Sequence, residues 1–143
     1  MSAPGLVSIS TQSAKRLRTH VERFARYFLR EMHAGGMMFE AVESEKSVGF
    51  IPYKAFLFVY QGHYVGASCF RYRDDQDKET PWLFTWLWIH PFVRRRGVLT
   101  QTWTELNAQV GNFRLAPPVS LHMQTFLRKA EAWDHGSQCY SRR

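Results

Sequence analysis

Residues 94–97, three arginines followed by a glycine, combine the residue types and the position that an anion-binding turn needs. They lie between a run of large apolar residues that ends at Ile89 and a stretch of helical periodicity that begins near Val98. A helix start carries unpaired backbone N–H groups and a partial positive charge, and a glycine lets the backbone come close to a ligand. We therefore expect this turn to bind a phosphate-like anion, although a salt-bridged surface position explains any single arginine equally well.

The elements that must position this turn can be traced from turn residues and apolar spacing. Periodicity predicts a helix over about 14–33, with Ser13 as its N-cap and Gly35-Gly36 after its end, and a second helix over 98–110. Gln61-Gly62 separates two β-prone segments and predicts a hairpin. The other expected elements are strands at 6–10, 37–42, 82–89 and 113–115 and a helix over 121–132 capped by Ser120, followed by a loose tail over 132–143.

Length and composition predict a single domain over residues 1–143. Nineteen Lys and Arg against twelve Asp and Glu give a net charge of +7, which favours an anionic partner such as a phosphate-rich cofactor, nucleic acid or acidic lipid. Cys69 and Cys139 make neither a disulfide framework nor a metal-ligand cluster, so we expect a reducing compartment and no metal. The sequence has neither a signal-peptide pattern nor the ~20 apolar residues of a membrane span, which predicts a soluble, cytoplasmic protein without a membrane partner.

Several charged and aromatic groups have a structural interpretation beside a functional one. The basic side of helix 14–33 is a solvated face or an RNA-binding face, and we favour the first because no stacking aromatics clearly alternate with its charges. The loop glutamates at 40, 43 and 45 are exposed residues or a source of a catalytic carboxylate. The tryptophans at 82, 86 and 88, which alternation places on one strand face, are core or the wall of a cleft.

Three segments match the motifs of one family in the correct order. Residues 58–66, FVYQGHYVG, form a hairpin with Val-Gly in its second strand. Residues 89–98, IHPFVRRRGV, contain an aliphatic residue, any residue and a proline, followed by the arginine and glycine of an acyl-CoA motif. Residues 120–129, SLHMQTFLRK, are similar to an Asn-x-x-Ala-x-x-Phe-Tyr-x-Lys helix. Over about residues 54–130 the chain thus resembles the GNAT superfamily of acyl-CoA-dependent N-acyltransferases.

The resemblance implies an α+β fold of three layers, with a mostly antiparallel central sheet flanked by helices. The sheet would be splayed between the strand that ends near Ile89 and the short strand near Leu115, and the family's two C-terminal strands would be truncated. Leu99 stands where the family has Gly or Ala, Ser120 replaces Asn, and Leu127 replaces the Tyr that protonates the leaving thiolate. These departures favour cofactor binding over turnover.

Binding of acetyl-CoA is the second implication of the resemblance. Backbone N–H groups of residues 95–99 would hold the pyrophosphate and the arginine side chains would add charge. The end of the preceding strand would pair with the pantetheine arm and direct an N–H at the thioester oxygen. The residues assigned to the cofactor in this way are Trp88, Ile89, Arg94, Arg95, Arg96, Gly97, Val98 and Leu99.

The implied reaction is direct attack of a primary amine on the thioester carbon in a ternary complex. A lysine-like amine, whose pKa is about 10.4, is almost wholly protonated at neutral pH and needs a base or a water chain. The candidates for proton transfer are His90 and Glu43 as bases and Ser120 and Tyr140 as acids, with Glu40 and His122 as weaker candidates.

Three functions remain open from the sequence. The first is an N-acetyltransferase whose acceptor is a small-molecule, peptide or aminoacyl amine, and the second is a CoA-binding module that has lost turnover. The third, a basic nucleic-acid-binding protein, is less favoured because CoA also explains the charge. The assembly is equally open, since Phe56 and Phe58 either belong to the core or continue the sheet across a homodimer.

Overall fold

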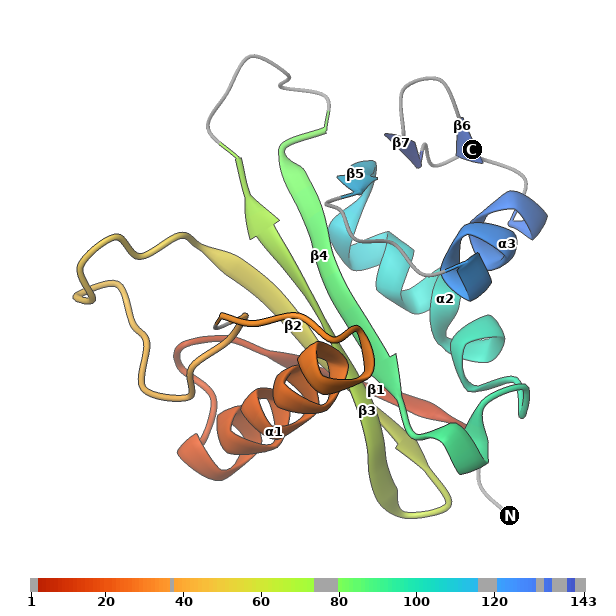
Figure 1. Ribbon diagram of the computed structural model, residues 1–143, viewed down its shortest axis with the longest axis horizontal. Helices are drawn as coiled ribbons and strands as arrows, with labels where there is room; N and C mark the ends of the chain where they lie inside the picture. Colours follow the sequence, from red (N-terminus) through yellow and green to blue (C-terminus); the bar gives the residue numbers. More distant parts are fainter. Residues whose placement is uncertain are drawn as a thin grey trace.

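The computed structural model describes residues 3–36, 38–73, 80–115, 121–130, 133–134 and 139–140. Its elements are β1 (Gly5–Ile9), α1 (Lys15–Glu31), β2 (Tyr53–Tyr60), β3 (His63–Tyr72), β4 (Trp82–Ile89), a 3-10 turn (Pro91–Val93), α2 (Val98–Val110), β5 (Phe113–Leu115), α3 (Leu121–Lys129), β6 (Trp133–Asp134) and β7 (Cys139–Tyr140). One sheet holds all the strands in the order β1-β2-β3-β4-β5-β7-β6, and only the β4–β5 pair is parallel (Figure 1).

The sheet separates two apolar cores, one under α1 and one under α2 and α3 (Figure 1). The side chains of β2 point alternately to the two faces of the sheet, so the strand contributes to both cores. Leu57 belongs to the same core as Phe24 of α1, while Phe56 and Phe58 belong to the same core as Leu106 of α2. Both phenylalanines are fully buried, and β2 lies inside the sheet between β1 and β3. They are therefore core residues, and the alternative that they continue a sheet across a homodimer is wrong.

A bulge in β4 changes which face its side chains occupy. Trp86 pairs with Cys69 and Phe84 with the next residue of β3, so Thr85 is an extra residue in β4. Trp82 consequently packs on the α2 side of the sheet, whereas Trp86 and Trp88 pack under α1. The prediction that the three tryptophans share one face is wrong, because alternation assumes a strand without a bulge.

The predicted hairpin and the second helix are confirmed, whereas two details of the N-terminal half are wrong. Gln61 and Gly62 have φ of 50° and 79°, the double left-handed turn that suits a two-residue hairpin. Ser13 does not cap α1, since its Oγ accepts the Ser10 N–H instead. The described part of segment 37–42 is loop rather than strand, whereas α1 ends at Glu31, close to the expected end and before the two glycines.

The C-terminal tail is part of the sheet. β7 pairs with β5, and β6 pairs with β7, although each of the two strands has only two residues. The expectation of a loose tail is wrong here, while the expectation that the C-terminal strands are truncated agrees with their length. Among the described residues no helix is long and apolar enough to cross a membrane, and no cluster of three His, Cys, Asp or Glu side chains could hold a metal.

Tyr140 joins this tail to the core, which leads to a prediction of stability. Its ring stacks on Phe113 with centroids 5.1 Å apart, and its Oη accepts a hydrogen bond of 2.9 Å from the Trp103 indole N–H in a buried setting. Tyr140→Phe keeps the ring contacts but leaves that indole N–H without an acceptor, so we expect a loss of about 1–3 kcal/mol in the free energy of unfolding. Chemical denaturation measures it, and a loss below about 0.5 kcal/mol would contradict the contact.

Candidate active site

The sheet opens beside β4 and leaves a cavity of about 680 Å³. In the described part of the chain β5 pairs only with residues 82–84, so from there to Ile89 the edge of β4 that faces β5 has no described strand partner (Figure 1). The predicted splay between these two strands is confirmed. α1, β4, the arginine turn, α2 and α3 all contribute to the cavity wall, through residues that include Phe28, Glu31, Met32, Thr85, Leu87, Ile89, Arg94, Arg95, Gly97, Leu99, Met123, Phe126 and Lys129.

The direction of the β4 backbone decides which N–H groups face this opening. The His90 N–H donates to the Val65 carbonyl of β3, and alternation turns the Trp88 N–H toward β3 as well. The N–H groups of Leu87 and Ile89 then point away from β3 to the open edge. The sequence-based assignment named Trp88 and Ile89. Of these only the Ile89 N–H faces the opening, and Leu87 was not named, because the direction depends on the register with β3.

Gly66 of β3 allows β3 and β4 to approach at the level of this edge. A Cβ at Gly66 would lie 2.3 Å from the Trp88 carbonyl oxygen and 2.9 Å from the Ile89 Cα. Both distances are shorter than the contacts that Cβ atoms make in proteins. The Val-Gly of the hairpin motif is thus explained by a backbone contact, which fixes the end of β4.

The turn before α2 presents free backbone donors. Arg95 and Gly97 have φ of 64° and 80°, and Gly97 is the N-cap of α2 without a side chain to cap it. The N–H groups of Val98, Leu99 and Thr100 have no partner within the described residues, because their intrahelical acceptors would lie before the helix. The predicted cradle therefore has the geometry of an anion site, with its donors beside the cavity.

The three arginines of the turn differ in their surroundings. Arg94 donates from Nε to the Ile89 carbonyl at 2.7 Å and pairs through Nη2 with Glu31 of α1 at 2.6 Å. Its side chain thus connects the turn to the end of α1, as the salt-bridge alternative allowed. Arg95 and Arg96 are exposed, and Arg95 also lines the cavity.

Leu99, the departure from the family motif, is half-buried and lines the cavity one residue into α2. It also packs against the core under α2, so part of its side chain is occupied by the fold. Leu99, which is larger than the Gly or Ala of the family motif, is therefore accommodated at this point of the helix, and its side chain takes up space in the cavity.

The acid–base candidates do not gather at the cavity. His90 is exposed, its Nδ1 accepts the Phe92 N–H at 3.2 Å, and it is not part of the cavity wall. Tyr140 lies in the core, and Glu40 and Glu43 line a second cavity. Ser120 and the side chain of His122 lie outside the described residues. Of the described titratable side chains in the wall, only Glu31 is an acid, and it is paired with Arg94.

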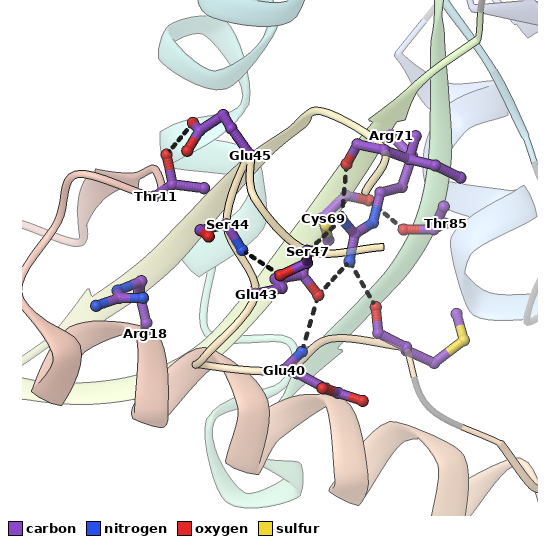
Figure 2. Close-up of polar contacts among 12 residues, drawn as sticks. Thr11, Arg18, Glu40, Glu43, Ser44, Glu45, Ser47, Cys69, Arg71 and Thr85 are labelled. Carbon is purple, nitrogen blue, oxygen red and sulfur yellow. Dashed lines mark hydrogen bonds and ion pairs between the residues drawn. The ribbon is translucent and has the colours of Figure 1, made fainter. Parts of the chain in front are cut away.

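The second cavity, of about 420 Å³, is lined mostly by residues of the loop between α1 and β2, whose polar contacts Figure 2 shows. Arg71 holds this loop through both carboxylate oxygens of Glu43, at 2.5 and 3.2 Å, and through the carbonyls of Ile51 and Met38. Glu43 also accepts the Glu40 N–H at 3.1 Å. Burial raises the pKa of the nearby Cys69 thiol to about 12, so this thiol is not a nucleophile at neutral pH.

The Arg71–Glu43 pair supports a second prediction of stability. The two side chains are 16% and 15% exposed, so Arg71→Met leaves a largely buried carboxylate and two carbonyls without their donor. We expect a loss of about 2–4 kcal/mol in the free energy of unfolding. The double variant with Glu43→Met should recover part of it, because the unpaired charge is removed as well. Equal stability of the wild type and Arg71→Met in urea denaturation would contradict this role.

Sequence reasoning also missed the contribution of the helices to the cavity. Phe28 lies on the apolar side of α1 and Met32 directly follows the helix as its C-cap, while Met123 and Phe126 lie on the apolar side of α3. Spacing identifies an apolar face, but it does not tell which turn of the helix reaches beyond the core to a cavity. Only the packing of the helices on the splayed sheet supplies that information.

Comparisons with known proteins identify the fold. No protein-family model and no curated protein matches the sequence. Among solved structures, an aminoglycoside acetyltransferase from an uncultured soil metagenomic sample, in complex with sisomicin, is similar with a TM-score of 0.58 and 14% identity over 90% of this chain and 87% of that chain. A ribosomal-protein-alanine N-acetyltransferase from Brucella melitensis biovar Abortus 2308 is similar with a TM-score of 0.52 and 12% identity over 93% and 94%. The chain therefore has the fold of the GNAT N-acetyltransferases.

Proposed function

We propose that this protein is an acetyl-CoA-dependent N-acetyltransferase. The observation that supports it is one cavity bordered by two sets of free backbone donors, at the start of α2 and along the open edge of β4. An acyl-CoA needs both: its pyrophosphate is an anion for the helix start, and its pantetheine amides can pair with a strand edge. The neighbours of the same fold are named as acetyltransferases.

Each part of the cofactor has residues that suit it. The N–H groups of residues 95–100 bind the pyrophosphate, with Arg95 and Arg96 adding charge, and the pantetheine arm follows β4. The N–H of Leu87 or Ile89 donates to the thioester oxygen and stabilises the negative charge that develops there during attack. Arg94 acts indirectly, because its bond to the Ile89 carbonyl holds the turn against the end of β4.

The reaction proceeds by attack of a neutral amine on the thioester carbon. A carbon–nitrogen bond forms, the carbon–sulfur bond breaks, and the CoA thiolate takes up the proton that the amine loses, directly or through water. Because no unpaired base lines the described part of the cavity, the chain contributes mainly position and electrostatics.

Thiol release tests this function. Purified protein with acetyl-CoA is incubated with a panel of amines that includes aminoglycosides, short peptides and polyamines, and free CoA thiol is measured over time. We expect steady release above the rate of hydrolysis with at least one class, and mass spectrometry should find one acetyl group on the acceptor. Release at the rate of hydrolysis with every amine would contradict turnover.

A CoA-binding module without turnover is the second candidate. It is favoured by Leu127, which is fully buried and brings no hydroxyl, and by the positions of His90 and Tyr140 away from the cavity. This candidate requires saturable binding of acetyl-CoA together with no thiol release, whereas the enzyme shows both. Binding and turnover measured on the same preparation separate the two.

A further inference from the structure

Exposed apolar side chains gather around the second cavity. Val42, Val48 and Ile51 are 66%, 104% and 51% exposed, and all three belong to its wall. Exposed large apolar residues that occur together around a hollow indicate an interaction site, whereas single ones do not. The rim of this cavity thus suits a partner with apolar side chains.

The polar part of the same wall carries one negative charge in excess. Glu43 is neutralised by Arg71 in a two-point ion pair. The carboxylate of Glu40 has no hydrogen-bond or ion-pair partner in the described part of the chain, and Figure 2 shows it pointing away from that pair. A cation beside apolar groups is therefore the complementary ligand.

Thr85 lies between this cavity and the proposed cofactor cavity, since it is the one described residue that lines both. It is the bulge residue of β4, next to the point where β4 and β5 separate, and its Oγ1 donates to the Cys69 carbonyl at 2.8 Å. A ligand held under the loop would therefore lie next to the open edge of β4, where we place the thioester carbon. The second cavity thus adjoins the proposed cofactor cavity at Thr85, beside the open edge of β4.

The lack of an unpaired base in the described wall limits which amine can react. At pH 7 roughly one in eight α-amino groups is neutral, with a pKa of about 7.7–8.0, against roughly one in 2,500 lysine side chains. A chain that positions the amine without deprotonating it therefore favours the α-amine.

From these observations we propose that the second cavity binds the N-terminal segment of a polypeptide whose first side chains are apolar, and presents its α-amino group to the thioester. This inference rests on the proposed function. Val42, Val48 and Ile51 contact the apolar side chains, Glu40 attracts the ammonium form, and the neutral form attacks after the proton leaves to water.

Three peptides of one length test the acceptor class. The first has a free N-terminus and two apolar residues, the second has the same sequence formylated and carrying a lysine, and the third has a free N-terminus followed by two acidic residues. We expect kcat/KM for the first, from thiol release with the wild-type chain, to exceed that of either other peptide at least tenfold, with acetylation at the α-nitrogen by mass spectrometry.

Two variants test the place of binding. Val48→Asp should raise KM for the first peptide about tenfold and leave the Kd of acetyl-CoA unchanged, because Val48 is exposed and absent from the cofactor cavity. Lys46→Gln, an equal change of charge on the same loop outside the cavity wall, should leave KM unchanged.

The failures are distinguishable. Turnover of another amine without preference for the first peptide, or no effect of Val48→Asp on its KM, overturns this inference and leaves the proposed function standing. No thiol release with any peptide or amine overturns both.

Discussion

Gly66→Ala should lower the free energy of unfolding by about 2–4 kcal/mol. The added Cβ would lie 2.3 Å from the Trp88 carbonyl oxygen, and the contact is to backbone, which cannot turn aside like a flexible side chain. Either β3 or the end of β4 must shift, and core overpacking of this kind typically costs about 1–3 kcal/mol or more. Since β4 carries the free N–H groups of the site, acetyl-CoA binding should weaken together with stability.

A second glycine of the same sheet provides the control. Gly5 lies in β1, and a Cβ there would approach only the Val59 Cβ, at 3.8 Å, which is ordinary contact. Gly5→Ala should leave stability unchanged or raise it slightly, because alanine restricts the unfolded chain more than glycine. Urea denaturation of both variants measures the difference. Equal stability of Gly66→Ala and Gly5→Ala would contradict the close approach of β3 and β4.

Much of the fold is predictable from the sequence because local signals specify it. The Gln61-Gly62 turn and the apolar spacing over 98–110 each favour one backbone state. The GNAT resemblance added the splay beside β4, which none of these signals contains. The two-residue strands at the C-terminus carry too few residues for any periodicity, so the tail could not be assigned.

The candidate site was less predictable, for two physical reasons. The bulge at Thr85 reverses the facing of every earlier side chain in β4, yet nothing in its sequence distinguishes this threonine from one in a regular strand. Acid–base candidates were chosen for their chemistry, but His90 and Tyr140 form contacts elsewhere in the fold. The left-handed φ of Gly97 suits a glycine at this turn, while its role in cofactor binding stays a prediction.

The second large effect is expected at Gly97. Its φ of 80° places its side-chain position beside the free N–H groups at the start of α2, and a Cβ there would meet only the flexible end of Gln101, at 3.0 Å. Gly97→Glu sets a carboxylate where the pyrophosphate would bind, and two like charges about 4 Å apart repel by about 1–4 kcal/mol for each phosphate group. We expect acetyl-CoA affinity to fall at least about 100-fold.

Gly97→Ala is the matched control, because it imposes the same left-handed strain without charge. It should cost about 1 kcal/mol of stability and change the affinity for acetyl-CoA only a few-fold. Far-UV circular dichroism of both variants should show an unchanged helix content. If Gly97→Ala lost as much acetyl-CoA affinity as Gly97→Glu, the loss would be caused by backbone strain and not by charge repulsion.

Calorimetric titration of acetyl-CoA into the wild type, Gly97→Ala and Gly97→Glu tests the account most directly. Acyl-CoA binding at the arginine turn predicts saturable binding of one molecule per chain to the first two proteins and none measurable to the third. Absence of saturable binding to the wild type, or equal affinity of Gly97→Glu and Gly97→Ala, would contradict it.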